Sequence, residues 1–178
     1  MSKKQSFFQA GFTLTELMAV VIILGILSAI GAGSYKKAVE RSRFSDGLMA
    51  ATAVMESVNR YYADNPLTTD AQYPTINKTD IDFPNQTSCG DYCIKTKFFE
   101  TTICNGGFTD AQRRKGTQVG DYAVRAYSSE FGSNRHKRAE CIYYNDGGKD
   151  LCISAGYPNC SGTTSSTVCA TSVAKCTK

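Results

Sequence analysis

Eight cysteines are the most obvious reactive groups of this 178-residue chain, and all of them lie at or beyond its midpoint. They are Cys89, Cys93, Cys104, Cys141, Cys152, Cys160, Cys169 and Cys176. An even number of clustered cysteines is typical of disulfides formed in an oxidising compartment. Metal binding is the alternative, but the spacings are irregular and His136 is the single imidazole, which disfavours zinc. We therefore expect disulfides, no metal, and a location outside the cytoplasm for this segment.

Few other residues in the sequence are candidates for catalysis. There is no paired-acid motif on a recognisable scaffold, no glycine-rich phosphate loop and no second histidine. A content of 42% hydrophobic and 20% charged residues is ordinary for a globular protein. We expect neither an enzyme nor a cofactor.

An acidic residue, Glu16, stands at the start of an apolar run. From Leu17 to Gly33 seventeen residues carry no charge, which is near the lower limit for spanning a bilayer. An acid near the bilayer centre costs roughly 2.5–3.5 kcal/mol and usually has a designated partner. Glu16 would lie at interfacial depth, where the cost is smaller, but its carboxylate still calls for a partner.

Two simple targeting devices could use the same run. A secretory signal peptide would be cut beyond it, where Ser28, Ala29, Gly31 and Ala32 are small, and a plain anchor would not be cut. Both devices favour an uncharged start to the run, so Glu16 argues against them.

A third possibility rests on a resemblance to a known family. The residues Gly11-Phe12-Thr13-Leu14-Thr15-Glu16-Leu17, followed by the apolar run, resemble the signal of type IV pilins and type II secretion pseudopilins. The match extends to about Arg43, includes Gly25 and Tyr35, and covers under a fifth of the chain.

The resemblance implies processing and assembly. A prepilin peptidase would cut between Gly11 and Phe12 and methylate the new amine of Phe12. In a filament, the Glu16 carboxylate would meet the Phe12 amine of a neighbouring subunit, and the opposite charge would offset part of the desolvation. The implied partners are other pilin subunits, the peptidase and N-methyltransferase, an inner-membrane assembly platform and, before assembly, membrane lipid.

Two features depart from the simplest form of that expectation. Gly33 stands where the family usually has proline, and Gly25, Gly31 and Gly33 could still allow the helix to melt. Lys3 and Lys4 precede the run, whereas more cations follow it, so the charge rule alone would place the head inside. We give more weight to the cysteines and to the family's topology, with the leader inside.

A helical stripe follows Tyr35. Its apolar residues, spaced alternately by four and three, are Phe44, Leu48, Ala51, Met55, Val58 and Tyr62. Pro66 ends the pattern near Asp64. One long helix is therefore expected to run from the apolar segment into the head, where its stripe packs on the core.

The head is expected to be turn-rich and then β-rich. Residues 67–120 read as a disulfide-tethered loop region, and strands are predicted at 121–128, 139–145 and 150–157. A hairpin turn at Asn145-Asp146-Gly147-Gly148 would place Cys141 opposite Cys152, which we predict as a disulfide. The other pairings remain open, because eight cysteines allow 105 arrangements.

Together these elements predict an α+β, pilin-like fold, with a long N-terminal helix packed on a small antiparallel sheet. The expected parts are a cleaved leader (1–11), a transmembrane and filament-core helix (12–34), an amphipathic helix (35–65) and a disulfide-rich head (66–178) with an exposed, disulfide-bounded C-terminal loop. The precursor would cross the bacterial inner membrane once, with its head outside the cytoplasm, and then join an extracellular filament.

The predicted function is that of a structural subunit of a type IV pilus or pilus-like filament. The alternatives are a type II secretion pseudopilin and, from a different class, a monomeric tethered or secreted adhesin. A nucleic acid partner could use the basic runs 113–115 and 135–138, but short basic runs are usually solvated loops, so this partner is disfavoured.

Overall fold

The computed structural model describes residues 11–65, 73–129, 139–165, 167–170 and 172–178. The chain divides into two compact units, residues 1–38 and residues 39–178. We call residues 39–178 the head and describe the two units separately.

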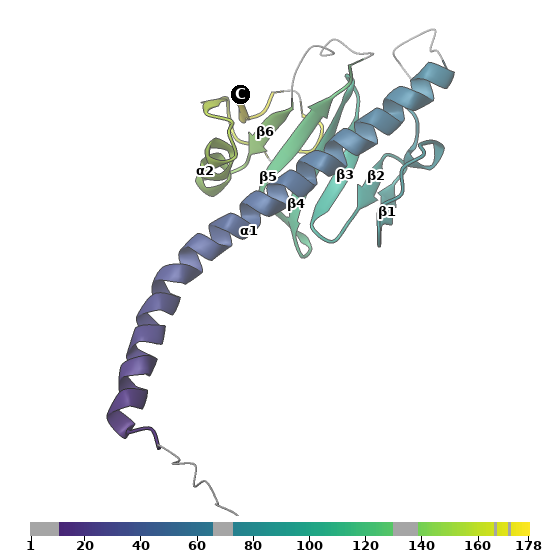
Figure 1. Ribbon diagram of the computed structural model, residues 1–178. Helices are drawn as coiled ribbons and strands as arrows, with labels where there is room; N and C mark the ends of the chain where they lie inside the picture. The colour runs from purple at the N-terminus through teal and green to yellow at the C-terminus, as the bar shows by residue number, and fades with distance from the viewer. Residues whose placement is uncertain (1–10, 66–72, 130–138, 166, 171) are drawn as a thin grey trace, which may run out of the picture. The chain divides into compact units, whose positions relative to one another are not determined.

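The chain begins with the long helix α1, strands follow it, and helix α2 comes between β6 and β7 in the sequence (Figure 1). The helices are α1 (Leu14–Asp64), the short 3₁₀ helix η1 (Ile76–Lys78) and α2 (Asp146–Ser154). The strands are β1 (Thr87–Gly90), β2 (Cys93–Lys95), β3 (Phe99–Cys104), β4 (Phe108–Lys115), β5 (Gln118–Tyr127), β6 (Glu140–Tyr143), β7 (Asn159–Ser161) and β8 (Lys175–Thr177). The expected α+β fold, with a long N-terminal helix, an antiparallel sheet and disulfides, is confirmed.

The head is built on one eight-stranded antiparallel sheet with the order β1-β2-β3-β4-β5-β6-β8-β7. The first six strands form a meander, so each strand pairs with its successor in the sequence. The last strand breaks this pattern, because β8 lies between β6 and β7. The C-terminal tail therefore contributes strands β7 and β8 to the sheet.

One face of α1 packs on this sheet within the head. Phe44, Ala51, Met55 and Val58 are buried there, and Leu48 and Tyr62 are partly buried against the same core, so the predicted stripe is confirmed. The sheet contributes side chains from several strands to that core, among them Phe99, Ile103, Ala111, Tyr122, Val124 and Cys141. Thr109 also donates a hydrogen bond of 2.8 Å to the α1 backbone at Ala51.

A charged clamp holds the beginning of the head's helical segment to β4. The guanidinium of Arg113 donates to both oxygens of Glu40, at 3.1 and 3.0 Å, and only 4% of the Arg113 side chain is exposed. Arg43 donates to the same carboxylate. Burial raises the pKa of Glu40, but the hydrogen bonds from Arg113 and Arg43 outweigh it and hold that pKa below its ordinary value of 4.5.

The opposite face of the sheet carries a second, partly ionic core. Arg125 and Asp110 form a fully buried bidentate pair at 2.6 and 2.7 Å. The tail completes it, because Arg125 also donates to the Ala170 carbonyl and the Cys169 amide donates to Asp110. A charge pair in the interior needs its remaining hydrogen bonds filled, and here the tail supplies them.

Two sequence predictions about the head are wrong. Residues 67–120 are not mainly loops, since they hold β1 to β4 and the start of β5. Strand β4 shows why: its buried residues include Asp110, Gln112 and Arg113, so hydrophobic alternation does not reveal it.

The predicted strand at 150–157 is instead helix α2 with the turn that follows it. Asn145 caps this helix by accepting a hydrogen bond from the Gly148 amide at 2.9 Å, so the Asn-Asp-Gly-Gly signal starts a helix and not a hairpin. Gly148 also lies against β5, where a Cβ would approach the Asp121 carbonyl oxygen to 2.0 Å.

All eight cysteines are paired in the head. The disulfides are Cys89–Cys93, Cys104–Cys169, Cys141–Cys152 and Cys160–Cys176. The structure thus joins Cys141 to Cys152, as expected, but between β6 and α2 instead of across a hairpin. Cys104–Cys169 ties the tail to β3, and Cys160–Cys176 joins the two tail strands β7 and β8.

We predict that Glu40→Gln lowers the free energy of unfolding of the chain by about 2 kcal/mol, because the buried Arg113 loses its charged acceptor. Urea unfolding of the detergent-solubilised chain at neutral pH measures this. The folded pKa of Glu40 is depressed, so its contribution is complete above pH 4.5 and is lost as the pH falls through that lower pKa. In acid, the wild-type chain and the Glu40→Gln variant should therefore have similar free energies of unfolding.

Glu56→Gln is the matched control, because Glu56 is exposed on the same helix and forms no ion pair among the described residues. A loss as large as that of Glu40→Gln in this control, or a loss that persists unchanged in acid, would contradict the clamp.

Candidate assembly site at the start of the N-terminal helix

The first turn of α1 is closed by a reciprocal pair of hydrogen bonds. The Thr13 amide donates to Glu16 Oε2 at 2.8 Å, and the Glu16 amide donates to Thr13 Oγ1 at 3.3 Å. The Thr13 hydroxyl donates to the same carboxylate oxygen at 2.8 Å. This is a capping box, with the N-cap residue and the third helical residue satisfying each other's backbone groups.

The capping box gives Glu16 a partner within its own chain. A carboxylate in the first turn is also favoured by the helix dipole. The sequence interpretation considered only a partner in another subunit and missed Thr13, although a threonine three residues before a glutamate and an apolar run is a readable signal. Glu16 therefore has a local role at the helix start, and its contact with another chain remains a prediction.

The expected scissile bond lies just before this turn. Gly11 and Phe12 precede the helix, and 87% of the Phe12 side chain is exposed. A bond in exposed, non-helical backbone is accessible to a protease. The preceding leader, residues 1–10 with Lys3 and Lys4, lies outside the described residues.

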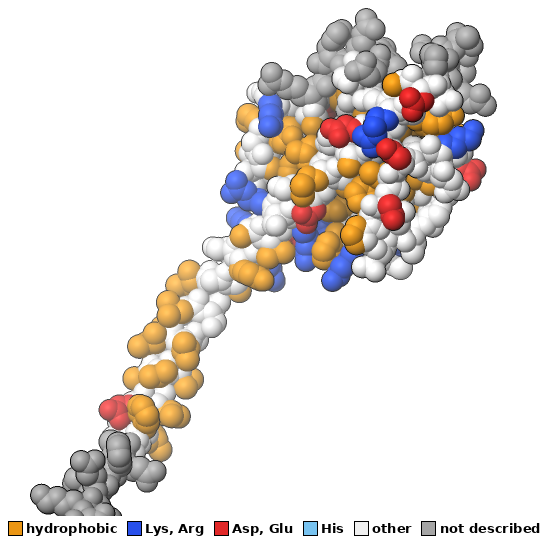
Figure 2. All heavy atoms as spheres, turned by 45° about the vertical axis from the view of Figure 1, so that its right-hand side comes forward, with side chains coloured by type: hydrophobic (Ala, Val, Ile, Leu, Met, Phe, Trp, Pro, Cys, Tyr) orange, Lys and Arg blue, Asp and Glu red, His pale blue; other side chains and the backbone are white. Residues whose placement is uncertain are grey.

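An apolar surface follows along the helix. Figure 2 shows hydrophobic side chains along this segment, and the large ones are all more than half exposed. They are Leu17, Met18, Val20, Val21, Ile22, Ile23, Leu24, Ile26, Leu27 and Ile30. α1 contains a window of mean hydropathy 2.3 with none of it buried, so it is long and apolar enough to cross a membrane.

The glycines of the apolar segment lie within continuous helix. α1 is helical through Gly25, Gly31 and Gly33, and a Cβ added at any of them would meet no atom within 4 Å. No close packing against the described residues requires these glycines. Their effect on helix stability in an assembled state remains a prediction.

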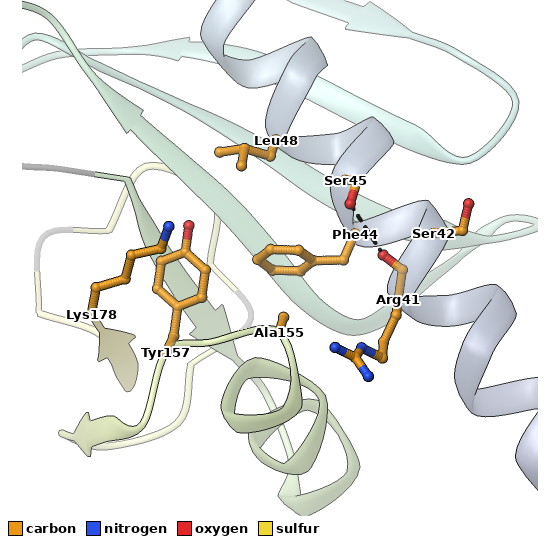
Figure 3. Close-up of a pocket in the computed structure, with 8 residues that line it drawn as sticks. All are labelled: Arg41, Ser42, Phe44, Ser45, Leu48, Ala155, Tyr157 and Lys178. Carbon is orange, nitrogen blue, oxygen red and sulfur yellow. Dashed lines mark hydrogen bonds between the residues drawn. The ribbon is translucent and has the colours of Figure 1, made fainter.

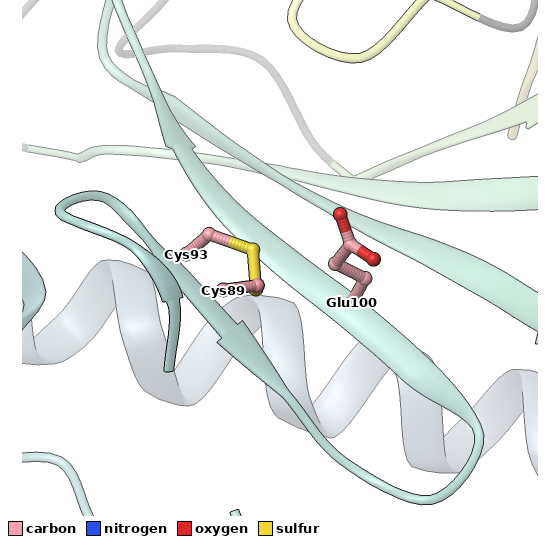
Figure 4. A group of neighbouring side chains, drawn as sticks. All are labelled: Cys89, Cys93 and Glu100. Atoms are coloured by element: carbon pink, nitrogen blue, oxygen red, sulfur yellow. A yellow bond between two sulfur atoms is a disulfide. The ribbon is translucent and has the colours of Figure 1, made fainter. Parts of the chain in front are cut away.

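Two cysteine clusters also include a carboxylate. Figure 4 shows Cys89, Cys93 and Glu100, and the second group is Cys104, Asp110 and Cys169. In both groups the two sulfur atoms form a disulfide, and a disulfide sulfur is not the thiolate that binds metals. Glu100 and Asp110 have cationic partners in Arg114 and Arg125.

The basic run at 113–115 is occupied within the head. Arg113 pairs with Glu40, Arg114 with Glu100 at 3.6 Å, and Lys115 with Asp121 at 2.5 Å. Cations already paired with carboxylates are poor phosphate ligands. The second basic run, 135–138, lies outside the described residues.

Comparison with known proteins identifies the N-terminal segment. The family model of the prokaryotic N-terminal methylation motif matches residues 7–32. The fimbrial protein EcpC of Eikenella corrodens is 45% identical over 56 residues, 32% of this chain and 37% of that protein. The type IV major pilin protein PilE1 of Neisseria gonorrhoeae is 29% identical over 109 residues, 61% of this chain and 46% of that protein.

The N-terminal segment therefore matches the motif shared by type IV pilins, and the chain is similar in sequence to pilins and fimbrial proteins. A fimbrial protein of Neisseria meningitidis is similarly related, with 29% identity over 103 residues, 58% of this chain and 54% of that protein. The matches therefore span between about a third and just over half of these relatives' lengths. No solved structure matches the chain significantly.

The capping box leads to a local prediction about the start of α1. Thr13→Ala should make the Glu16 amide exchange with solvent several-fold faster, because it removes the side-chain acceptor of that amide. Thr13→Ser keeps the hydroxyl and should retain the protection. Amide exchange followed by NMR in detergent micelles measures both variants, and equal exchange in Thr13→Ala and Thr13→Ser would rule out the capping role.

Proposed function

We propose that this chain is a type IV pilin, a structural, non-catalytic subunit of a type IV pilus or a pilus-like filament. The observation that carries the proposal is a capped carboxylate, Glu16, at the start of an apolar helical segment of which no residue is buried. A soluble monomer would gain nothing from such a surface, whereas lipid or other copies of the helix would cover it.

We infer that processing occurs between Gly11 and Phe12. The bond lies in exposed backbone outside the helix, within the segment that matches the methylation motif. Cleavage would create an amine on Phe12, the residue before Thr13, whose amide already binds the Glu16 carboxylate. The proposed partners for this stage are a prepilin peptidase with N-methyltransferase activity, an inner-membrane assembly platform and membrane lipid.

Glu16 then has two possible partners, and this sets the register of assembly. In the free subunit its carboxylate is bound by Thr13, and in the filament it would meet the Phe12 amine of a neighbour. Apolar helices can slide past one another with little change in contact, but a charge pair forms at one axial position. We infer that Glu16 selects that position.

The head favours a filament exposed outside the cell. Four disulfides stabilise it, and one of them, Cys104–Cys169, anchors the C-terminal tail to β3. Disulfides persist in oxidising surroundings, which fits an inner-membrane precursor with its head outside the cytoplasm and then an extracellular fibre. A type II secretion pseudopilin remains the second candidate, because its N-terminal signal is of the same kind.

The test of processing is mass spectrometry of the N-terminal peptide from membrane and sheared surface fractions of the native host. We expect a mature chain that begins at N-methylated Phe12 and is present in the sheared fraction. A chain that begins near Ala32 or Ser34 would indicate ordinary secretion, as for the rival adhesin, and would overturn the proposal.

The Glu16→Gln variant removes the charge at this position but can keep the capping hydrogen bonds. Glutamine can also close a capping box, so the helix start should survive while the charge pair is lost. We expect normal cleavage at Gly11 and a roughly tenfold or greater fall of the pilin in the sheared fraction. Immunoblots of sheared and membrane fractions measure it, with Glu56→Gln as the control, and wild-type filament yield would contradict the assembly role.

A further inference from the structure

A pocket in the head lies between α1 and the segment that follows α2 (Figure 3). Its volume is about 360 Å³, within the range of small-molecule sites. Phe44 and Tyr157 form its aromatic wall, with ring centroids 5.6 Å apart and an edge-to-face arrangement. Leu48 and Ala155 add apolar contact surface.

Two cations border this pocket, and no acidic side chain lines it. They are Arg41 from α1 and Lys178 at the C-terminal end, and neither forms an ion pair with another described residue. The Lys178 ammonium lies 5.3 Å from the centre of the Tyr157 ring. This contrasts with the cations of β4, each of which has a carboxylate partner.

The Tyr157 hydroxyl, which borders the same pocket and is not fully enclosed, lacks a hydrogen-bond partner among the described residues. Tyr157 is 2% exposed, yet its hydroxyl makes no hydrogen bond to any described residue. Figure 3 draws that hydroxyl at the same end of the pocket as the Lys178 ammonium. Burial raises the pKa of Tyr157, so the hydroxyl stays protonated and can donate.

The remaining polar side chains are less available. Ser45 donates to the Arg41 carbonyl at 3.4 Å, and Ser42 points away from the aromatic rings in Figure 3. A sugar, with many hydroxyls to satisfy, is therefore a poor fit. A compact apolar body with one anionic group suits the donors and the wall better.

We propose that this pocket binds a small organic carboxylate whose apolar or aromatic body packs against Phe44 and Tyr157. Its carboxylate accepts from the Tyr157 hydroxyl and is held by the charge of Lys178 or Arg41. The site belongs to the head and does not depend on filament assembly.

The test uses benzoate as the probe and the full chain in detergent micelles. Saturation-transfer NMR should report benzoate binding with a dissociation constant on the order of millimolar, as expected for so small a ligand. Benzyl alcohol, which has the same ring without the charge, should bind at least several-fold more weakly. Empty micelles give the background.

Tyr157→Phe is the sharpest variant, because the hydroxyl has no partner among the described residues of the head and its removal should leave the packing intact. It should weaken benzoate binding by roughly threefold to tenfold, and Arg41→Ala with Lys178→Ala by roughly tenfold or more. Lys78→Ala removes an exposed cation that does not line the pocket and should change nothing.

Two results would overturn the proposal. One is the absence of benzoate binding above the micelle background in the wild-type chain. The other is equal binding by Tyr157→Phe, the cation variants and Lys78→Ala, which would mean that benzoate interacts elsewhere. Near-UV circular dichroism of each variant confirms that the head remains folded.

Discussion

The contact between one face of α1 and the sheet organises the head. Phe44, Val54 and Val58 bury their side chains against strands that are far away in the sequence, so the helix and the meander cannot form their core separately. Glu40 and Arg113 add a charged hydrogen-bonded contact where the head's helical segment begins. Arg113 is buried, so an unpaired Arg113 charge would be costly. Avoiding this cost matters more than the attraction between Glu40 and Arg113.

The other face of the sheet is closed by the tail, and its chemistry differs. Arg125 and Asp110 are buried there with their remaining hydrogen bonds supplied by Cys169 and Ala170. A tail held by Cys104–Cys169 is thus a structural part of the head as well as a surface element. Variation in sequence between the anchored points would be tolerated more readily than loss of the anchors.

The N-terminal unit differs from the head because its apolar side chains are exposed. The described hydrogen-bonded polar side chains of this unit lie in the first turn of α1. Thr13 and Glu16 satisfy each other in the free chain, which lets a carboxylate stand at the start of an apolar helix without an external partner. Assembly, as proposed here, would replace or share these bonds with the amine of another subunit. The Glu16 side chain would then both cap the start of the helix and set the axial position of the subunit in the filament.

The sequence alone determined the features that depend on local pattern. The apolar run and the stripe from Phe44 to Tyr62 are short-range, so spacing and composition were sufficient, and the Gly11–Glu16 signal was recognised from its resemblance to a known family. Tertiary structure decided β4, whose buried Asp110 and Arg113 look solvent-exposed until their partners are known, and α2, where the same Asn-Asp-Gly-Gly signal fits a hairpin or a helix cap. It also decided three of the four disulfide pairings, because these depend on which strands become neighbours, and a one-dimensional spacing carries no such information.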